Sequence, residues 1–337
     1  MTIKELAEKA GVSFSTVAKA LNNNETINIE TRRRIQSLAK KYNYRPNILA
    51  KGLRNRHTQT IGVILNDLQS PFYSEIYKAI GDILYKNGYT MYLADSKYDE
   101  TTERKNILTM IGLGVEGLII SAVNERSNNL ELLLMEDVKT VFIDNRPLWD
   151  DISCVYVDHT VASYLATKYL ITHGHKKILL LNGPVNLPSS RRFYQGYLDA
   201  LKEATLPVNP SLTIYDSLGL LETVSLMNKI WRGNHRVGLN DFTAIITLSD
   251  LSAIGIYEAA LNNNFSIPRD YSVVGYDNIF GTEYLSPPLT TIHQPKEQTG
   301  SLAVTMLLNS ILSKAEDNFQ IILNPTLIER QSVLKID

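Results

Sequence analysis

From residue 60 onward, short runs of β-branched and aliphatic residues alternate with longer stretches of helical periodicity. In the first series the expected strands are residues 60–65, 90–94, 118–121 and 140–144, with helices at 73–86, 100–112 and 129–136 between them. In the second series they are residues 155–158, 177–182, 212–215, 244–248 and 272–276, with helices at 159–172, 192–203, 220–231 and 250–261. Alternation of this length is typical of parallel sheets with helices on both faces. The two series therefore predict two doubly wound subdomains.

The end of the chain supplies a strand at 289–293, a helix at 298–312 and a strand at 320–323, which we expect to cross back between the two halves. The expected body is residues 58–337. One of its subdomains would comprise about 58–157 plus 291–320, and the other 158–290 plus 321–337.

The first 46 residues have a purely helical periodicity. Residues 3–10 carry one apolar stripe, Gly11 breaks it, and Ser13 is a good N-cap for a second helix that ends at Leu21. A third helix is expected from about Thr31 to Tyr42, with a stripe that includes Tyr42. Helix, glycine turn and helix in this order are typical of a helix-turn-helix DNA-binding module. The alternative is a three-helix bundle whose basic side chains form a solvated face.

Charge and the second helix favour DNA binding over that alternative. The helix is expected to turn Val17 and Leu21 inward, which leaves an outward face of Phe14, Ser15, Ala18 and Lys19. Residues 1–60 hold 12 Lys and Arg against 4 Asp and Glu, a net charge of +8. The whole chain holds 34 Lys and Arg and 35 Asp and Glu, so residues 61–337 hold 22 basic and 31 acidic residues, a net charge of −9. A basic head on an acidic body is typical of a nucleic-acid-binding module joined to a domain that should not bind phosphate.

Composition also bounds the cellular setting. The single cysteine, Cys154, excludes an intrachain disulfide and a thiolate zinc cluster, and it favours a reducing compartment. The N-terminus has charges where a signal peptide has an apolar run, and no stretch approaches the ~18 apolar residues that span a bilayer. We therefore expect a cytoplasmic protein that does not associate with membranes.

Two short motifs have a possible enzymatic or metal-binding interpretation. Gly112, Gly114 and Gly117 have the spacing of a dinucleotide-binding loop, but they end a helix and lead into a strand, which reverses the required order. We interpret them as a helix cap and a turn. His173 and His175 lack a nearby third ligand, so we expect them to close the helix at 159–172. We expect no enzymatic activity, no cofactor and no metal.

The N-terminal motifs resemble those of a known family of regulators. Residues 2–13, 15–17, 21–22 and 44–47, with Ala50 and Leu53, resemble the headpiece of the lactose/galactose repressor (LacI/GalR) family of bacterial transcriptional regulators. The resemblance implies base contacts by Phe14, Ser15, Lys19 and Leu53, and phosphate contacts by Ser13, Thr16, Asn22, Tyr44 and Asn47. Ala18 and Lys19 stand where most members have Ser and Arg. Because Lys lacks the rigid fork of Arg, we expect a different preferred operator.

Residues 47–57 are expected to be a hinge and linker, and 47–53 match the family's hinge helix. An isolated helix needs ~12–15 residues to persist in water, and Gly52 costs roughly another 1 kcal/mol relative to Ala. We therefore expect this segment to fold only where two copies meet over DNA, with Leu53 wedged into a minor-groove step. The alternative is a plain linker with one exposed leucine.

The residues that follow the expected strands form the candidate ligand site, since ligands bind beyond the carboxyl ends of open parallel sheets. They are Asn66, Asp67, Phe72, Tyr73, Asp95, Ser96, Ser121, Asp144, Asn145, Arg146, Asp158, Arg191, Arg192, Asp216, Ser249, Asp250, Asp277 and Asn278. Carboxylates, hydroxyls, arginines and aromatic faces suit a polyhydroxylated ligand such as a sugar. Asp158 and Asp250 have a competing interpretation as N-caps of the helices that follow.

The same family resemblance extends over the body, through residues 60–64, 70–73, 174–175, 195–197, 250–255, 272–277 and 287–292. It implies a periplasmic-binding-protein-like effector domain that also dimerises. Phe193 stands where the family usually has a ligand-binding Arg, with Arg191 or Arg192 as candidate replacements, and Ser249 stands for the usual Asn. The expected effector contacts are Phe72, Tyr73, Ser121, Arg146, Arg191, Arg192, Phe193, Ser249 and Asp277.

These observations predict a helix-turn-helix headpiece at 1–46 followed by an α/β effector-binding body. The expected function is repression of carbohydrate-utilisation genes by a homodimer on a pseudo-palindromic operator, controlled by a small-molecule effector, for which the polar site favours a sugar. The alternatives are a cytoplasmic sugar-binding protein, and a regulator controlled by a protein partner. The sequence specifies neither the effector nor whether it releases or promotes DNA binding.

Overall fold

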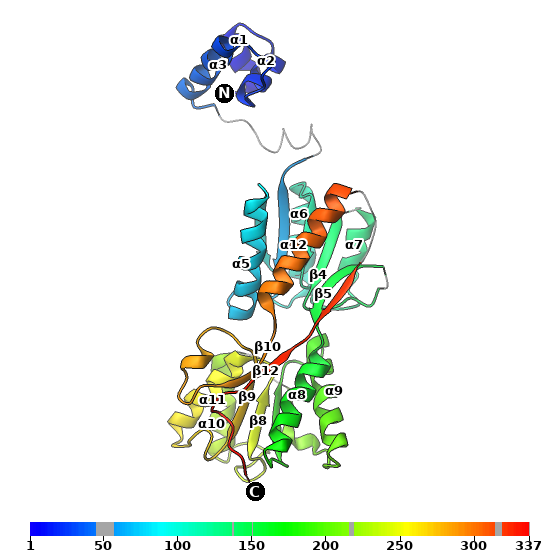
Figure 1. Ribbon diagram of the computed structural model, residues 1–337, viewed down its shortest axis with the longest axis vertical. Coiled ribbons are helices and arrows are strands. Elements are labelled where there is room, and N and C mark those ends of the chain that lie inside the picture. The colour runs from blue at the N-terminus through cyan, green and yellow to red at the C-terminus, as the bar shows by residue number, and fades with distance from the viewer. Residues whose placement is uncertain (45–56, 137, 150, 216–218, 314–318, 337) are drawn as a thin grey trace. The chain divides into compact units, whose positions relative to one another are not determined.

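The computed structural model describes residues 1–44, 57–136, 138–149, 151–215, 219–313 and 319–336 (Figure 1). The chain forms two compact units, Met1–Thr58 and Gln59–Asp337. The body predicted from the sequence starts at residue 58, one residue before the second unit. Most of the predicted hinge, including Asn47 and Leu53, lies outside the described residues, as does Asp216.

The head consists of α1 (Ile3–Ala10), α2 (Phe14–Leu21) and α3 (Ile29–Lys41). The side chains of Thr2 and Glu5 form a reciprocal capping box at the start of α1, and Gly11 ends it with a φ of +62°. The Ser13 side chain accepts a hydrogen bond from the Thr16 amide and so caps α2. The three helices pack around a core of Leu6, Ala7, Ala10, Val17, Ala20, Ile35 and Ala39. The predicted helices and the glycine turn are confirmed.

The third helix differs from the prediction at both ends. It begins two residues earlier than expected, because Asn28 is its N-cap and accepts a hydrogen bond from the Glu30 amide at 2.8 Å. Tyr42 follows the helix as its C-cap and is 40% exposed, so it does not continue the buried stripe. Its ring instead lies beneath the Lys9 ammonium, 4.8 Å from the ring centre. A cation–π contact of this kind accounts for an exposed aromatic at the end of a basic helix.

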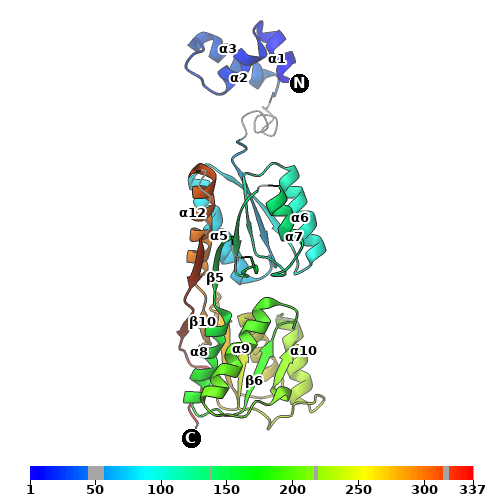
Figure 2. The ribbon, with the colours of Figure 1, turned by 90° about the vertical axis from the view of Figure 1, so that its right-hand side faces the viewer.

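The first lobe of the body contains a six-stranded parallel sheet in the order β11-β5-β4-β3-β1-β2. Its strands are β1 (Thr60–Leu65), β2 (Thr90–Asp95), β3 (Gly117–Ile120), β4 (Lys139–Ile143), β5 (Ser153–Val157) and β11 (Gln320–Leu323). Its helices are α5 (Pro71–Lys86), α6 (Glu100–Gly112), α7 (Asn129–Met135) and α12 (Lys296–Ser313). Figure 2 shows α5 and α12 on one face of the sheet, and α6 and α7 on the other.

The second lobe contains a second six-stranded sheet in the order β12-β10-β9-β8-β6-β7, with β12 antiparallel to β10. Its strands are β6 (Ile178–Asn182), β7 (Thr213–Tyr215), β8 (Ala244–Thr247), β9 (Ser272–Asp277), β10 (Thr290–His293) and β12 (Thr326–Ile328). Helices α8 (His159–Thr172) and α9 (Pro188–Glu203) cover one face, and α10 (Leu220–Trp231) and α11 (Asp250–Asn262) cover the other (Figure 1). Two short 3₁₀ helices, η1 (Pro210–Leu212) and η2 (Thr282–Tyr284), lie in its loops. Two doubly wound lobes were predicted and are confirmed.

The chain passes between the lobes after β5, after β10 and after β11. The last two passages differ from the predicted subdomain boundaries. Residues 291–293 were assigned to the first subdomain, but β10 pairs with β9 and β12 in the second sheet. Residues 321–323 were assigned to the second, but β11 pairs with β5 in the first sheet. In both cases the strand stays in register with its neighbour to its last residue, and the chain crosses only afterwards.

Helices α8 and α9 approach each other so closely that Gly196 leaves no room for a side chain. A Cβ at this position would overlap the backbone carbonyl oxygen of Thr160 and lie 2.9 Å from the Tyr164 amide nitrogen. We therefore expect Gly196→Ala to lower the free energy of unfolding by about 2–3 kcal/mol, because backbone atoms must shift to relieve the overlap. Urea titration of both proteins measures this change.

Gly81 is a suitable control because it also lies within a helix, α5, but has space around it. A Cβ there would meet only the Met91 methyl group at an ordinary 3.5 Å. Gly81→Ala is expected to raise the free energy of unfolding by about 0.5–1 kcal/mol through helix propensity alone. Equal effects of the two substitutions would contradict the close approach of α8 and α9.

Candidate DNA-binding face and effector cleft

The outward face of α2 presents the residues expected to read bases. Phe14 is 52% exposed, and Ser15 and Lys19 are exposed beside it. Val17 and Ala20 point into the core on the opposite face, whereas Leu21 is only partly buried. Base contacts by Phe14, Ser15 and Lys19 remain a prediction, and none of the three belongs to the described core of the head.

The expected phosphate contacts lie at the ends of the helices. The Ser13 hydroxyl accepts a hydrogen bond from the Thr16 amide at 3.2 Å, and the hydroxyls of the two residues are 2.9 Å apart. Asn22 is the C-cap of α2. Tyr44 packs in part against the head's core, and this partial burial raises the pKa of its phenol, which stays a hydrogen-bond donor at neutral pH. Side chains at helix ends of this kind can position a helix on the DNA backbone.

Two of the head's cations stabilise the head itself. The Arg34 guanidinium donates to the Ala10 carbonyl at 3.0 Å, and that of Arg32 donates to the Asn23 carbonyl at 3.1 Å. Both bonds tie α3 to the helix-turn-helix. The +8 charge therefore overstates the number of side chains that are free to contact phosphate.

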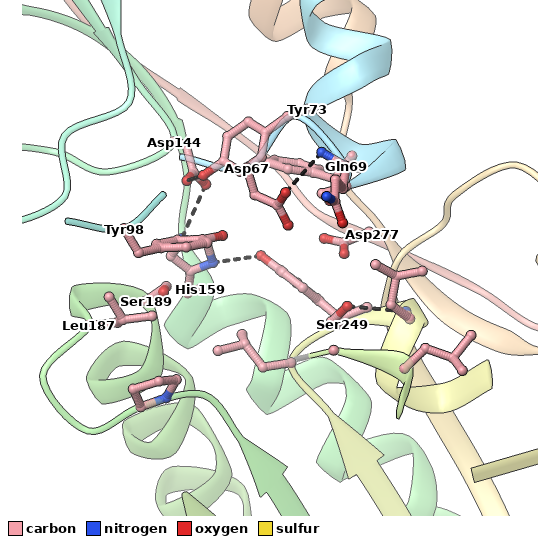
Figure 3. Close-up of a pocket in the computed structure, with 18 of the residues that line it drawn as sticks. Asp67, Gln69, Tyr73, Tyr98, Asp144, His159, Leu187, Ser189, Ser249 and Asp277 are labelled. Atoms are coloured by element: carbon pink, nitrogen blue, oxygen red, sulfur yellow. Dashed lines mark hydrogen bonds and ion pairs between the residues drawn. The ribbon is translucent and has the colours of Figure 1, made fainter. Parts of the chain in front are cut away.

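In the body, a cavity of about 720 Å³ lies between the two lobes. Figure 3 shows Asp67, Tyr73 and Asp144 facing it from the first lobe, and His159, Ser249 and Asp277 from the second. Its other polar wall residues are Gln69, Ser70, Tyr98, Asn145, Asn186, Ser189, Glu222, Tyr276 and Gln294. Its apolar wall residues are Phe72, Pro184, Leu187, Leu220, Leu221, Leu248 and Leu251. A volume in this range, with apolar walls and convergent polar groups, is typical of small-molecule sites.

The first-lobe wall is built around Asp144, which follows β4 with a φ of +64°. The Tyr73 hydroxyl donates to its Oδ2 at 2.8 Å, and the buried Ser121 hydroxyl lies 3.3 Å from the same oxygen. Asn66 Nδ2 donates to Ser121 Oγ at 2.9 Å from behind. Burial first, and then the Asp144 carboxylate, raise the pKa of Tyr73 well above its usual value. Tyr73 is therefore a fixed donor, and the network holds Asp144 in place.

The second-lobe wall is built around His159, the first residue of α8. Its side chain is only 3% exposed, and its Nδ1 is 2.7 Å from the hydroxyl of Tyr276. Its Nε2 lies 3.8 Å from Asp144 Oδ1 across the cleft and has no hydrogen-bond partner. Burial lowers the pKa of His159, with Asp144 opposing the shift. The ring is therefore neutral at pH 7 and can donate from one nitrogen only.

Asp277 closes the base of the cleft at the end of β9. Its φ of +112° is uncommon for a residue with a side chain, and such outliers cluster at functional sites. Gln294 Nε2 donates to its Oδ1 at 2.7 Å, and the buried Lys296 ammonium donates to its carbonyl oxygen at 2.5 Å. Burial first, and then the neighbouring Asp250 carboxylate, raise the pKa of Asp277 well above its usual range.

Asp250 and Asp158 have structural roles. The buried Asp250 accepts hydrogen bonds from the Ile279 amide at 2.9 Å and from the Thr291 hydroxyl at 2.7 Å, and burial raises its pKa to about 7. Asp158 caps α8 by accepting from the Thr160 amide at 2.8 Å. Neither lines the cavity. Asp158 is therefore the N-cap that the alternative interpretation expected, whereas for Asp250 that interpretation is wrong, because Ser249 caps α11 by accepting from the Leu251 amide.

Four of the nine expected effector contacts line the cavity: Phe72, Tyr73, Ser249 and Asp277. The other five do not. Ser121 lies behind Tyr73 and Asp144 and positions them. Arg146 is only partly buried but outside the lining, and its Nε has no partner. Phe193 is fully buried in the core of the second lobe, where its ring packs edge-on against Tyr276 at 5.2 Å.

Arg191 and Arg192 are held by an acid from the opposite lobe. Their Nη2 atoms lie 2.9 and 2.7 Å from the two carboxylate oxygens of Glu125, whose side chain is 7% exposed. Glu125 follows β3 in the first lobe, whereas both arginines belong to α9 in the second. The proposed replacement of the family's arginine by either residue is therefore wrong for this conformation, because the pair joins the lobes instead.

Sequence reasoning overlooked Tyr98 and His159. Asp67, Asp144 and Asn145 follow strands and were recognised there, although they were not among the nine expected contacts. Tyr98 follows β2 by three residues, and His159 directly follows the capping Asp158. An aromatic and an imidazole just beyond strand ends were the available signals.

The motifs set aside in the sequence have the expected structural roles. Gly112 ends α6, Gly114 makes a turn with a φ of +67°, and Gly117 begins β3. His173 caps α8. Within the described ranges no group of three His, Cys, Asp or Glu side chains is placed to hold a metal ion. No helix in the same ranges is long and apolar enough to cross a membrane.

Comparison with protein families matches both parts of the chain. Residues 2–47 match the model described as bacterial regulatory proteins, lacI family. Residues 58–331 match the model described as periplasmic binding proteins and sugar binding domain of LacI family. Together the two models cover the head and almost all of the body.

Individual relatives match over the full length. The HTH-type transcriptional repressor PurR of Photorhabdus laumondii is 33% identical over 337 residues, which is 99% of this chain and 97% of that protein. PurR of Histophilus somni is 31% identical over 333 residues, 98% of each chain.

Solved structures share the fold of this chain. The lac repressor dimer bound to operator and the anti-inducer ONPF superposes with a TM-score of 0.81 at 23% identity over 99% of each chain. A LacI family regulator from Enterococcus faecium with bound ribose has a TM-score of 0.73 at 27% identity, covering 82% of this chain and 100% of that one. The chain therefore belongs to the LacI family, whose members bind operator DNA and small-molecule effectors as dimers, and it is a DNA-binding transcriptional repressor, not an enzyme.

Proposed function

We propose that this repressor controls carbohydrate-utilisation genes in the cytoplasm and that its effector is a sugar bound in the cleft between the lobes. The observation that carries the proposal is that the cavity is lined from both lobes. A ligand that touches both walls favours one relative orientation of the lobes over others. The ribose bound to the Enterococcus faecium regulator supports a sugar as the ligand class.

DNA binding is proposed to follow the arrangement of helix-turn-helix dimers. Each α2 would lie in a major groove, with Phe14, Ser15 and Lys19 at base edges and Ser13, Thr16, Asn22 and Tyr44 at phosphates. The hinge, with Asn47 and Leu53, would lie between the two heads. A two-fold dimer then requires a pseudo-palindromic operator.

The second lobe offers a surface for that dimer. Phe280 precedes η2, and Tyr284 is its last residue. Their side chains are 77% and 74% exposed. Their rings pack edge-on at 5.9 Å, so they form one aromatic patch. Contiguous exposed apolar side chains can mark a protein–protein contact. We assign this patch to the dimer interface.

Effector and operator are coupled through the lobe orientation. Cations of α9 in the second lobe hold Glu125 of the first, and the buried Lys296 at the start of α12 donates to the carbonyl oxygens of Asp277 and Asn278 in the second lobe at 2.5 and 2.9 Å. A ligand that alters these contacts shifts the equilibrium between lobe orientations. A coupling of ~1–3 kcal/mol would change operator affinity ~5–150-fold.

A comparison of the full chain with residues 59–337 tests the DNA-binding part. The full chain is expected to select a two-fold symmetric site from random DNA, with an affinity that falls steeply as salt rises. The acidic body alone is expected to bind neither this site nor heparin. Fluorescence anisotropy over a salt series measures both. Weak, salt-insensitive binding by the full chain would favour the sugar-binding alternative.

A further inference from the structure

Carboxylates are the charged groups of the described cleft wall. Its acidic wall residues are Asp67, Asp144, Glu222 and Asp277. Among the described wall residues there is neither lysine nor arginine; residues 216–218, next to the wall residue Gly219, lie outside them. Even with a proton on Asp277, the other three acids give the cleft a negative formal charge. Like charges in a site shielded from water repel strongly.

Three of the described cations around the cleft are engaged elsewhere, whereas Arg146 lies outside the cavity lining and has a buried Nε without a partner. Arg191 and Arg192 are paired with Glu125. The Lys296 ammonium is 2% exposed and donates to the carbonyl oxygens of Asp277 and Asn278 at 2.5 and 2.9 Å. Bringing any of them to a ligand would leave a buried acid or carbonyl without its partner, which is costly.

Asp144 and His159 form a matched acceptor and donor at the centre of the cleft. Asp144 Oδ2 is engaged by Tyr73 and Ser121, whereas its Oδ1 faces His159 Nε2 at 3.8 Å. Because Nε2 faces the Asp144 carboxylate, we assign the proton of His159 to Nε2, and the Tyr276 hydroxyl then donates to Nδ1. Nε2 is buried and has no partner. A ligand oxygen about 2.8 Å from both atoms fits this separation and would donate to one and accept from the other.

We propose that the cleft takes a polyhydroxylated ligand without negative charge, and that Asp144 and His159 determine its specificity by holding one hydroxyl between the lobes. Neutral sugars and nucleosides meet this requirement, whereas sugar phosphates and sugar acids do not. The proposal rests on the proposed function for the location of the site. It goes further in naming the charge of the ligand and the two residues that recognise it.

A matched panel of probes tests the charge requirement on the full-length protein. The panel comprises glucose, galactose, mannose, ribose, cellobiose, adenosine and cytidine; glucose 6-phosphate, ribose 5-phosphate, glucuronate and cytidine 5′-monophosphate; and the purine bases hypoxanthine and guanine. We expect thermal stabilisation by at least one of the neutral polyhydroxylated probes. We expect none by the anionic probes. Stabilisation by a phosphate or an acid, by a purine base alone, or by no compound at all would overturn the proposal.

Two variants test the residues with the probe that binds best. Asp144→Asn and His159→Phe are each expected to weaken its binding by about tenfold or more, measured by isothermal titration calorimetry. Asp82→Asn is the matched control, because Asp82 is a surface residue paired only with Lys78. Far-UV circular dichroism and the ligand-free Tm show whether each variant is folded. If His159→Phe unfolds, His159→Gln, which retains a donor, must bind the probe within a fewfold of the parent protein. Undiminished binding by Asp144→Asn would refute the assignment.

The outcome for the proposed function is separate. If a neutral probe binds through Asp144 and His159 but does not change operator affinity, the effector role fails and the ligand assignment stands. If an anionic probe binds and changes operator affinity, the ligand assignment fails and the effector role stands.

Discussion

Replacing Lys19 by alanine is expected to lower affinity for the selected operator by about 10- to 100-fold, because a side chain that contacts a base contributes ~1–3 kcal/mol of discrimination. The affinity for random DNA should fall only by the smaller amount that follows from losing one positive charge near the phosphates. The difference arises because a base contact acts at one sequence, whereas phosphate attraction acts at all of them. Competition titrations with operator and scrambled duplexes measure both quantities.

Phe14→Ala provides a second, uncharged test of the same face. Phe14 is 52% exposed and outside the head's core, so its loss should not unfold the head. We expect a loss of about tenfold on the operator and almost none on random DNA, since an apolar contact with a base edge carries sequence information without charge.

Lys40→Ala is the control for charge in both cases. Lys40 is exposed in the last turn of α3 and does not belong to α2. It should weaken binding to operator and random DNA alike. Equal losses on the two duplexes for Lys19→Ala and Phe14→Ala would show that α2 does not read bases.

The second large effect is expected at Asp277. Asp277→Ala should weaken binding of the best neutral probe by about 10- to 100-fold, because a ligand group left without its buried hydrogen-bond partner costs ~1–3 kcal/mol. One of its oxygens is engaged by Gln294, and the other is available to a ligand. Operator affinity without the probe should stay within about twofold. Anisotropy titrations of the operator, with and without the probe, give both numbers.

The controls for Asp277 address folding. An alanine with a φ near +112° is unfavourable, so some loss of thermal stability is expected in addition to the loss of binding. Asp82→Ala, a surface substitution of the same kind, should leave probe binding unchanged. A folded Asp277→Ala protein that still binds the probe and responds to it would remove Asp277 from the site.

The sequence predicted the fold well because each lobe follows from local periodicity. Buried strands such as β1 and β3 have continuous apolar runs, and the helices between them have clear start signals. The start of α3 was placed too late because Asn28, a weaker signal than an apolar stripe, determines it. The crossing points of the lobes were misplaced by about three residues because strand pairing, not composition, sets where a strand ends.

The site was less predictable, because its side chains are assigned by contacts between lobes. Arg191 and Arg192 have the chemistry of a ligand anchor, and only the position of Glu125 in the other lobe shows that they are engaged. Phe193 has the position of the family's ligand-binding residue but the burial of a core residue. His159 was overlooked because its role depends on Tyr276 and Asp144, which are distant in sequence. Pairing at long range leaves no local pattern.

Reciprocal coupling between operator and effector is the most direct test of the account as a whole. Operator affinity is measured with and without the saturating neutral probe, and probe affinity is measured with and without saturating operator. The account predicts that both affinities change by the same factor, between ~5 and ~150, because coupling between two sites is mutual. The account would be contradicted by a probe that binds the cleft without changing operator affinity, and whose own affinity is the same with and without operator.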